Sequence, residues 1–252
     1  MNASKKMKFY NKIYNVNVDT DEQRLNSILT KLNHENNRIP KTKCIKCPGK
    51  ECVESDCCKD FNPPMYFTEF LNIIKYLEKR ESDIVKLRNK CIDRMANPKD
   101  NSCSLLKEDG NCLCYEVRPY NCRMFGICSG TEWEKRLEAV RKMDENKEIK
   151  FEKQCDGVKI VNKKSEPKKI INDKISNDIF NNIAKLDEEY FSKIYNSKFV
   201  NSGITYLSFE SHFLIITIGP ENLEKILSNK EAFEKNEITK EEFDQFVFSL
   251  KD

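Results

Sequence analysis

The stretch that decides the fold is CSLLKEDGNCLCYEVRPYNCRMFGIC, which runs from Cys103 to Cys128 and carries five cysteines. Its apolar residues follow neither a helical nor a strand-like spacing, so it predicts an irregular segment. Such a segment lacks the apolar neighbours that would bury five thiols in a hydrophobic core. A metal shared by several of these cysteines would supply the missing cohesion. The segment therefore predicts a metal-binding core.

A second cluster of five cysteines lies upstream, in the aperiodic stretch from Cys44 to Phe61. Cys44, Cys47 and the Pro48-Gly49 pair that follows have the form of a knuckle. In a knuckle two thiolates hold one metal, and the glycine lets backbone N–H groups turn toward sulfur. The adjacent cysteines 57 and 58 add a constraint, because neighbouring side chains of an extended backbone point to opposite sides. One site with spare thiols and two four-sulfur sites are both compatible with this count.

We expect cysteines of both clusters to converge on the metal. The candidate ligands are Cys44, Cys47, Cys57, Cys58, Cys103, Cys112, Cys122 and Cys128, with Cys52 and Cys114 as additional ligands. The chain's histidines, His34 and His212, lie outside both clusters, so an all-sulfur site is expected. Such a site suits zinc or an iron–sulfur cluster, and the sequence leaves both open. Cys91 falls on the apolar face of a predicted helix and is expected to be a buried core thiol.

Composition limits the classes of function. The chain has 44 basic and 41 acidic residues and a net charge of +3, so nucleic acid is not expected as a partner. Its start has no apolar run of signal-peptide length, and its densest apolar run, Phe213 to Ile218, is too short to span a bilayer. No membrane partner and a cytoplasmic location are therefore expected. In a reducing cytosol, clustered cysteines bind metal or do redox chemistry more often than they form disulfides.

Helices are expected on both sides of the cysteine clusters. Helical spacing of apolar residues predicts helices over residues 19 to 33, 67 to 95 and 171 to 195, and another that begins at Thr131. Two short helices close the chain, the last capped by Thr239 and Glu242. Residues 204 to 218 are rich in β-branched and aromatic side chains and indicate a short β-hairpin. The predicted fold class is mainly α, with an irregular cysteine-rich metal-binding core flanked by helices.

A basic stretch that contains Pro167, residues 156 to 170, is typical of a linker. It would separate a cysteine-rich metal-binding domain with flanking helices, residues 1 to 155, from a mainly helical C-terminal region, residues 171 to 252.

The segment GNCLCYEVRPYNCRMFGIC, with Cys103-Ser-Leu-Leu before it and the upstream cysteines, resembles the CxxCxxCC family of zinc- or iron-chelating proteins (YkgJ-like). The matching positions are Gly110, Cys112, Tyr115, Arg118, Pro119, Cys122, Arg123 and Phe125. Two features depart from the family pattern. Nine residues separate Cys47 from Cys57, and Cys114 stands where the family usually has an aliphatic residue. The resemblance implies a metal-chelating domain over about a third of the chain.

Arg118 and Arg123 are expected close to the metal. Four thiolates around a divalent ion leave a charge of −2, which a guanidinium can offset while it donates to sulfur. The alternative is that each arginine pairs with Glu116 or with solvent.

The favoured function is a metal-binding protein that acts as a structural, carrier or sensor module. The sequence lacks a G-x-G-x-x-G, P-loop, H-E-x-x-H or nucleophile-elbow motif and indicates no catalytic residues. The alternative is an iron–sulfur enzyme, because a similar cysteine cluster occurs in flagellin lysine-N-methylase-like proteins. The sequence leaves open whether the chain is an enzyme, and it indicates no protein partner.

Overall fold

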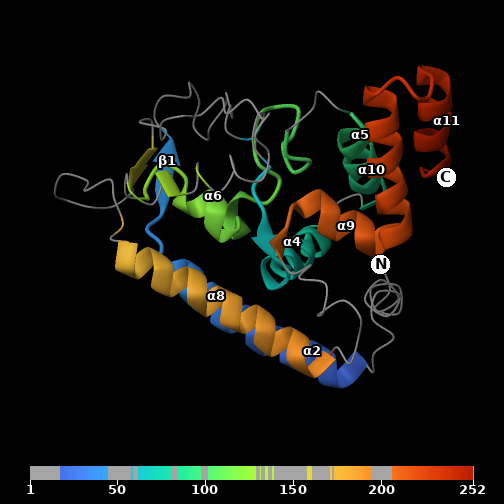
Figure 1. Cartoon of the computed structure of the whole chain (residues 1–252). Coiled ribbons are helices and arrows are strands. Elements are labelled where there is room, and N and C mark those ends of the chain that lie inside the picture. The colour runs from blue at the N-terminus through green and yellow to red at the C-terminus, as the bar shows by residue number, and fades with distance from the viewer. Residues whose placement is uncertain are drawn as a thin grey trace.

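The computed structural model describes residues 18–44, 58, 62–80, 84–97, 102–128, 131, 134–135, 138, 158–160, 171, 173–194 and 206–251. Over these ranges the chain is mainly helical, as predicted (Figure 1). The longer helices are α2 (Val18–Asn37), α4 (Phe67–Lys79), α5 (Ile84–Ala96), α8 (Asp173–Ile194), α9 (Phe209–Thr217), α10 (Pro220–Glu234) and α11 (Lys240–Ser249). The short elements are the 3-10 helix η1 (Tyr115–Val117), helix α6 (Tyr120–Met124), and strands β1 (Thr42–Cys44), β2 (Met65–Tyr66), β3 (Val158–Ile160) and β4 (Tyr206–Leu207).

Helices α2 and α8 lie side by side along one edge of the molecule (Figure 1). Their buried residues recur at helical spacing, so the helices predicted over 19 to 33 and 171 to 195 are confirmed: Leu25, Ile28, Leu29 and Leu32 on α2, and Ile179, Ile183, Leu186 and Tyr190 on α8. The Arg24 guanidinium reinforces the pair by donating to the carbonyls of Glu189 at 2.5 Å and Tyr190 at 3.1 Å. Two helices far apart in sequence therefore pack as one unit.

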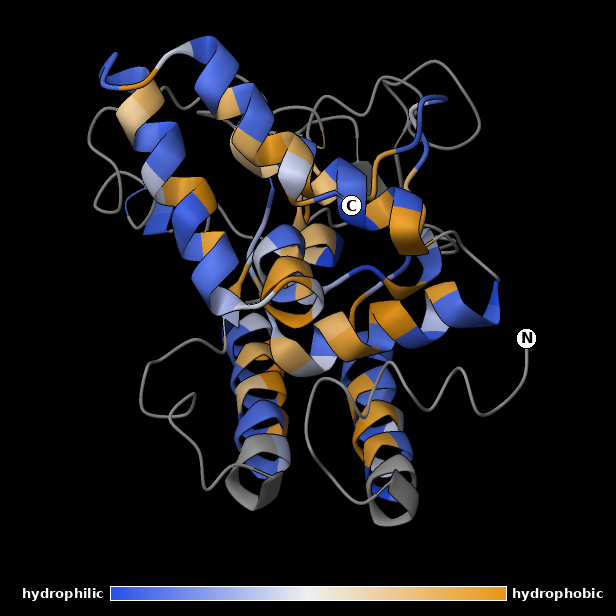
Figure 2. Ribbon diagram, turned by 90° about the vertical axis from the view of Figure 1, so that its right-hand side faces the viewer, coloured by the Kyte–Doolittle hydropathy of each residue, from blue (hydrophilic) through white to orange (hydrophobic). Residues whose placement is uncertain are grey.

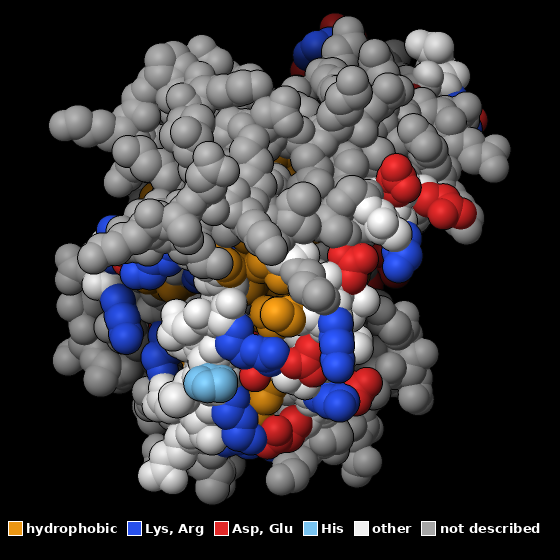
Figure 3. All heavy atoms as spheres, turned by 90° about the vertical axis from the view of Figure 1, so that its left-hand side faces the viewer, with side chains coloured by type: hydrophobic (Ala, Val, Ile, Leu, Met, Phe, Trp, Pro, Cys, Tyr) orange, Lys and Arg blue, Asp and Glu red, His pale blue; other side chains and the backbone are white. Residues whose placement is uncertain are grey.

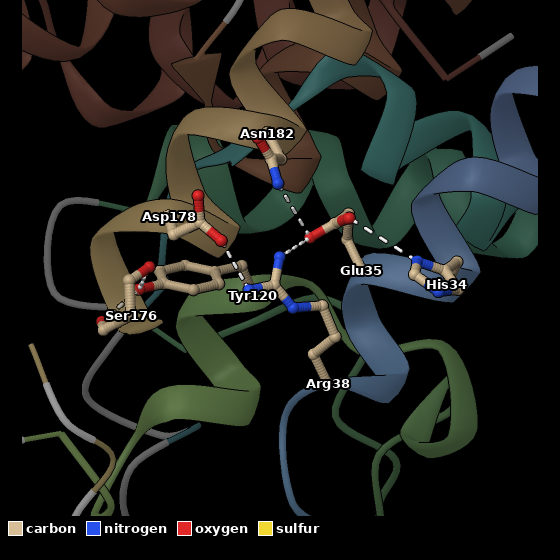
Figure 4. A network of polar contacts seen from close by, with 7 residues as sticks. All are labelled: His34, Glu35, Arg38, Tyr120, Ser176, Asp178 and Asn182. Carbon is tan, nitrogen blue, oxygen red and sulfur yellow. Dashed lines mark hydrogen bonds and ion pairs between the residues drawn. The ribbon is translucent and has the colours of Figure 1, made fainter. Parts of the chain in front are cut away.

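Polar contacts on the outer surface also join α2 to α8 (Figure 4). The Glu35 carboxylate accepts hydrogen bonds from Arg38 at 2.5 Å and from Asn182 at 3.3 Å. Arg38, the residue after α2, also donates to Asp178 of α8 at 2.5 Å, so a second contact joins this end of α2 to α8. Figure 3 shows the resulting surface, on which acidic and basic side chains lie next to one another. Mixed charge of this kind gives this face no single electrostatic preference for a charged partner.

Helix α4 forms the centre of the core, because every residue from Phe67 to Ile74 is buried. The prediction of a single helix over 67 to 95 is wrong. Helix α4 ends at Lys79, where the Arg80 N–H closes a tighter turn on the Leu77 carbonyl at 3.1 Å, and α5 begins at Ile84. The apolar spacing continues across this break because Leu77 and Ile84 are seven residues, or about two helical turns, apart. Helix α5 ends at Ala96, one residue past the predicted end of the helix.

The strands predicted over residues 204 to 218 are found only at β4, since residues from Phe209 onward form α9. The Ser208 side chain caps this helix by accepting the N–H of Ser211 at 3.1 Å. Phe209, His212 and Phe213 are then buried at helical spacing. Burial of this face overrides the local preference for strand.

Two small sheets tie distant parts of the chain together. Strand β4 pairs antiparallel with β2, and β1 pairs antiparallel with β3, with Cys44 opposite Val158. Strand β3 lies inside the stretch 156 to 170 that was expected to be a linker, and the rest of that stretch lies outside the described residues. Helices on both sides of this stretch contribute to one cluster of buried apolar residues. The apolar faces of the helices point into that cluster (Figure 2).

The two closing helices are confirmed as α10 and α11, and Thr239 with Glu242 forms the predicted capping box of α11. Phe233 on α10 stacks on Phe243 of α11 at a centroid distance of 5.2 Å. Thr131, Glu134, Lys135 and Glu138 are helical, while the predicted apolar face of their helix lies outside the described residues. No helix in the described ranges has the length and apolar character needed to cross a lipid bilayer.

Candidate metal centre

A tight turn between Cys103 and Cys114 brings the cysteines of the downstream cluster together. The Leu113 N–H donates to the Leu105 carbonyl at 2.7 Å, and Leu106 and Cys112 form an isolated antiparallel bridge. Gly110 closes the turn with a φ of 82°, a conformation that a residue with a side chain rarely adopts. The chain thus doubles back and carries Cys112 toward Cys103.

The thiols of Cys112 and Cys114 are in direct contact, with their sulfurs 3.7 Å apart. This distance exceeds a disulfide bond of about 2.05 Å, so both residues are thiols. The hydrogen bond between the sulfurs lowers the pKa of Cys112 to about 7, and the charge of Arg118 also lowers it. The same hydrogen bond, together with burial, raises the pKa of Cys114 well above its usual value. One of the two sulfurs therefore readily carries a negative charge.

Three hydrogen bonds to backbone groups fix the position of Cys103. Its N–H donates to the Cys58 carbonyl at 2.8 Å, and its own carbonyl accepts a hydrogen bond from Arg94 of α5. The next N–H, that of Ser104, donates to the buried carboxylate of Glu210 on α9 at 2.5 Å. Burial raises the pKa of Cys103 well above its usual value, and negative charge on Glu210, Cys122 and Cys112 raises it further. Cys103, Cys112 and Cys122 are thus close enough to interact electrostatically.

Cys122 is positioned by α6, whose N-terminus is fixed to the core. Pro119 precedes the helix with φ −67°, and the N–H of Tyr120 donates to the buried carboxylate of Glu69 on α4 at 2.6 Å. The Tyr120 hydroxyl lies 2.6 Å from the hydroxyl oxygen of Ser176 on α8 (Figure 4). Pro119, together with contacts to α4 and α8, therefore fixes the backbone before Cys122.

Arg118 and Arg123 hold the loop backbone. Arg118 donates to the Tyr115 carbonyl at 3.2 Å, and its guanidinium lies 3.8 Å from the centre of the Tyr115 ring. Arg123 donates to the carbonyls of Arg118 and Glu116, each at 2.6 Å. Negative charge on Cys122 and Cys114 favours the charged form of Arg123, although its burial lowers the pKa. Both cations are thus electrostatic neighbours of the thiols while they hydrogen-bond to carbonyls.

Both ends of the upstream cluster lie against the downstream one. At one end, the Tyr115 hydroxyl donates to the carbonyl of Thr42, two residues before Cys44 on β1. At the other end, the Cys58 carbonyl accepts the N–H of Cys103. The candidate ligands between these ends, Cys47, Cys52 and Cys57, lie outside the described residues.

Within the described ranges, no three Cys, His, Asp or Glu side chains form a group that could hold a metal ion. A complete site would therefore need donors that lie outside the described residues, such as Cys47, Cys52 and Cys57. No family model, curated protein or solved structure matches this chain. The resemblance to the CxxCxxCC family stays a prediction.

Two more cysteines lie in the cluster of buried apolar residues. Cys91 is fully buried on α5, as predicted, and burial strongly raises the pKa of its thiol. Cys128, a candidate ligand, is 1% exposed in this cluster, as Cys114 is, and its role as a ligand stays a prediction. The two histidines also stay apart from the thiols: His34 is exposed on α2, and His212 is buried against the Met65 carbonyl at 3.0 Å.

Sequence reasoning missed two buried carboxylates that shape the site, Glu69 and Glu210. Burial raises the pKa of Glu69 to about 7, while hydrogen bonds from the N–H groups of Tyr120 and Tyr66 lower it. Both glutamates stand alone inside apolar runs, in YFTEFL and in LSFESHFLII. An isolated acid in such a run is a usable signal, because a buried carboxylate needs hydrogen-bond donors and marks a place where backbone segments meet.

Proposed function

We propose that this chain binds a metal through thiolates of the two cysteine clusters. Cys112 and Cys114 would bind the same ion, and two more thiolates, drawn from Cys103, Cys122 and the upstream cluster, would complete a set of four. The observation that carries the proposal is the 3.7 Å distance between the sulfurs of Cys112 and Cys114. The bound metal would supply cohesion to a segment that has little regular structure of its own.

The sulfur–sulfur distance fits two cysteines on one tetrahedral metal atom. Two sulfurs that each lie about 2.3 Å from one zinc ion, at a tetrahedral angle, are separated by about 3.75 Å. In a four-iron cluster each cysteine binds a different iron atom, which holds the sulfurs farther apart. Zinc is the metal we propose, and a two-iron cluster, in which two cysteines share each iron atom, is the alternative that fits the same distance. The cations of Arg118 and Arg123 would offset the charge of −2 that four thiolates leave on a zinc ion.

The role we propose is that of a structural, carrier or sensor module of the cytoplasm, and the resemblance to the CxxCxxCC family implies its metal-chelating part. Its support is the contrast between abundant thiols and a lack of catalytic motifs in the sequence. A reducing compartment keeps such thiols available to a metal.

The test is the metal content of the full chain purified without oxygen from cells supplied with both zinc and iron. We expect a colourless protein with stoichiometric zinc. A brown protein that absorbs near 400 nm would replace zinc with an iron–sulfur cluster. The variant Cys114→Ser should lose metal, while Cys91→Ala, which changes a buried thiol of α5, should retain it. A wild-type chain that takes up neither metal would overturn the proposal.

A further inference from the structure

The Cys112–Cys114 pair also has the arrangement of a redox switch. We infer that these two residues form a reversible disulfide and that its formation releases the metal. The inference rests on the proposed function, because it describes how the same site is regulated. The sulfurs lie 3.7 Å apart. A disulfide bond is about 2.05 Å long, so the two sulfurs need to approach by roughly 1.7 Å in total.

The backbone around the pair is held in place, so the approach falls to the side chains. The N–H of Leu113, between the two cysteines, donates to the Leu105 carbonyl, and the Val117 N–H donates to the Cys114 carbonyl at 2.9 Å. Each sulfur has less than 1 Å to travel (about half of that total). Rotation about the Cα–Cβ bonds is the movement we propose, and it leaves both hydrogen bonds in place.

The two thiols differ in their access to solvent. Cys112 is partly exposed, whereas Cys114 is 1% exposed. An oxidant therefore reaches the Cys112 sulfur first. The buried Cys114 sulfur lies 3.7 Å away and can then react with the oxidised Cys112 sulfur. An accessible thiol beside a protected second thiol is the arrangement of redox-sensing cysteines.

The oxidant we name is a peroxide. The Cys112 thiolate attacks one oxygen of hydrogen peroxide, the O–O bond breaks, and sulfenic acid and hydroxide form. The Cys114 thiolate then attacks the sulfenic sulfur, the S–O bond breaks, and a second hydroxide leaves. The two thiolates lose two electrons, and two protons from solvent convert the two hydroxides to water. The disulfide sulfurs carry no negative charge, so the metal loses two thiolate ligands at once.

The test treats the zinc-loaded full chain with one equivalent of hydrogen peroxide and follows zinc release with a coloured chelator. The remaining thiols are then alkylated, and the chain is cleaved after glutamate. This cleavage frees peptide 109–116, which contains Cys112 and Cys114 as its cysteines. We expect this peptide without alkyl groups and lighter by two hydrogen atoms, in step with zinc release. Dithiothreitol should restore both thiols and allow zinc to rebind.

The variant Cys91→Ala serves as the control and should respond like the wild type. If zinc is released while peptide 109–116 carries two alkylated thiols, or is linked to a third cysteine, the inference is overturned and the metal site stands. Retention of zinc after the linkage has formed also overturns it. A chain that never binds metal overturns the proposed function. In that case there is no metal to release on oxidation, and this part of the inference is overturned as well. Peptide 109–116 then shows whether the disulfide forms in the metal-free chain.

Discussion

The buried carboxylate of Glu69 accepts the N–H of Tyr120 at 2.6 Å and so fastens the start of α6 to the start of α4. Its other oxygen accepts the N–H of Tyr66 at 3.0 Å, one residue before α4 begins. Cys122 lies two residues after Tyr120. The buried helix α4 thereby helps to determine where this thiol lies.

Replacing Glu69 by Gln should loosen this junction. Each Glu69 oxygen accepts an N–H, so an amide NH₂ on one side would face a donor and leave a buried N–H unsatisfied. The expected loss of stability is about 1–3 kcal/mol, measured by urea unfolding, with lower metal occupancy. Glu116→Gln is the matched control, because the Glu116 side chain is 68% exposed and should matter little. Equal urea midpoints for the two variants would contradict this role for Glu69.

Asp187 on α8 should make the chain less stable as the pH rises. It is buried and accepts the N–H of Thr68 at 2.7 Å, and burial raises its pKa from 3.8 to about 7. Between about pH 4 and pH 7 the folded chain holds a proton that the unfolded chain has lost, so stability falls as pH rises through this window. Wild type should therefore unfold at a higher urea concentration at pH 5 than at pH 8.

The variant Asp187→Asn isolates this effect. The amide oxygen still accepts the Thr68 N–H, but the side chain has no proton to lose, so the difference between pH 5 and pH 8 should shrink. Glu69 contributes in the same direction, since its pKa is also raised to about 7, and it leaves a residual slope. An unchanged pH dependence in Asp187→Asn would exclude Asp187 as its source.

Cys91→Ala and Cys122→Ala should separate core thiols from ligands. Cys91 is fully buried on α5, so its loss should cost on the order of 1 kcal/mol and leave the metal content unchanged. Cys122 interacts electrostatically with Cys103 and Cys114, so its loss should lower metal occupancy. Metal analysis of both variants, purified side by side, decides the matter. Metal loss in Cys91→Ala alone would reverse the two assignments.

Removing the metal with a strong chelator should loosen residues 102 to 128 before it affects the α2–α8 pair. The contacts of Arg24 and Lys31 with Glu189 involve no cysteine, so that pair does not depend on a bound ion. Amide hydrogen exchange, read by mass spectrometry, should rise first in the cysteine segment. Uniform protection after verified metal loss would mean that the metal does not stabilise this segment.

Helical spacing was sufficient to predict α2 and α8, because one face of each helix is buried against the other. It failed between residues 79 and 84, where two helices share one apolar spacing, and at α9, where tertiary burial decided between helix and strand. The β1–β3 and β2–β4 pairings join segments far apart in sequence, and no local pattern encodes such a partner.

The sequence predicted which segment forms the candidate site, but not how its residues are positioned in space. The cysteine pattern singled out the downstream segment, and the contact between Cys112 and Cys114 lies within it. The side chains that hydrogen-bond to the backbone of that segment come from other helices: Glu69 from α4, Arg94 from α5 and Glu210 from α9. These are hydrogen bonds between a side chain and a distant backbone, and spacing along the chain carries no information about them.

The pairing of α2 with α8 also has a consequence for biosynthesis. Arg24 is made 165 residues before Glu189, whose carbonyl it contacts. At about 5–20 residues per second, the ribosome needs roughly ten to thirty seconds to cover that distance. During this interval the part of α2 that packs on α8 has no partner, and by its end every cysteine of both clusters has been made. The nascent chain thus presents its thiols to the surrounding solution before the last helices arrive to close the core.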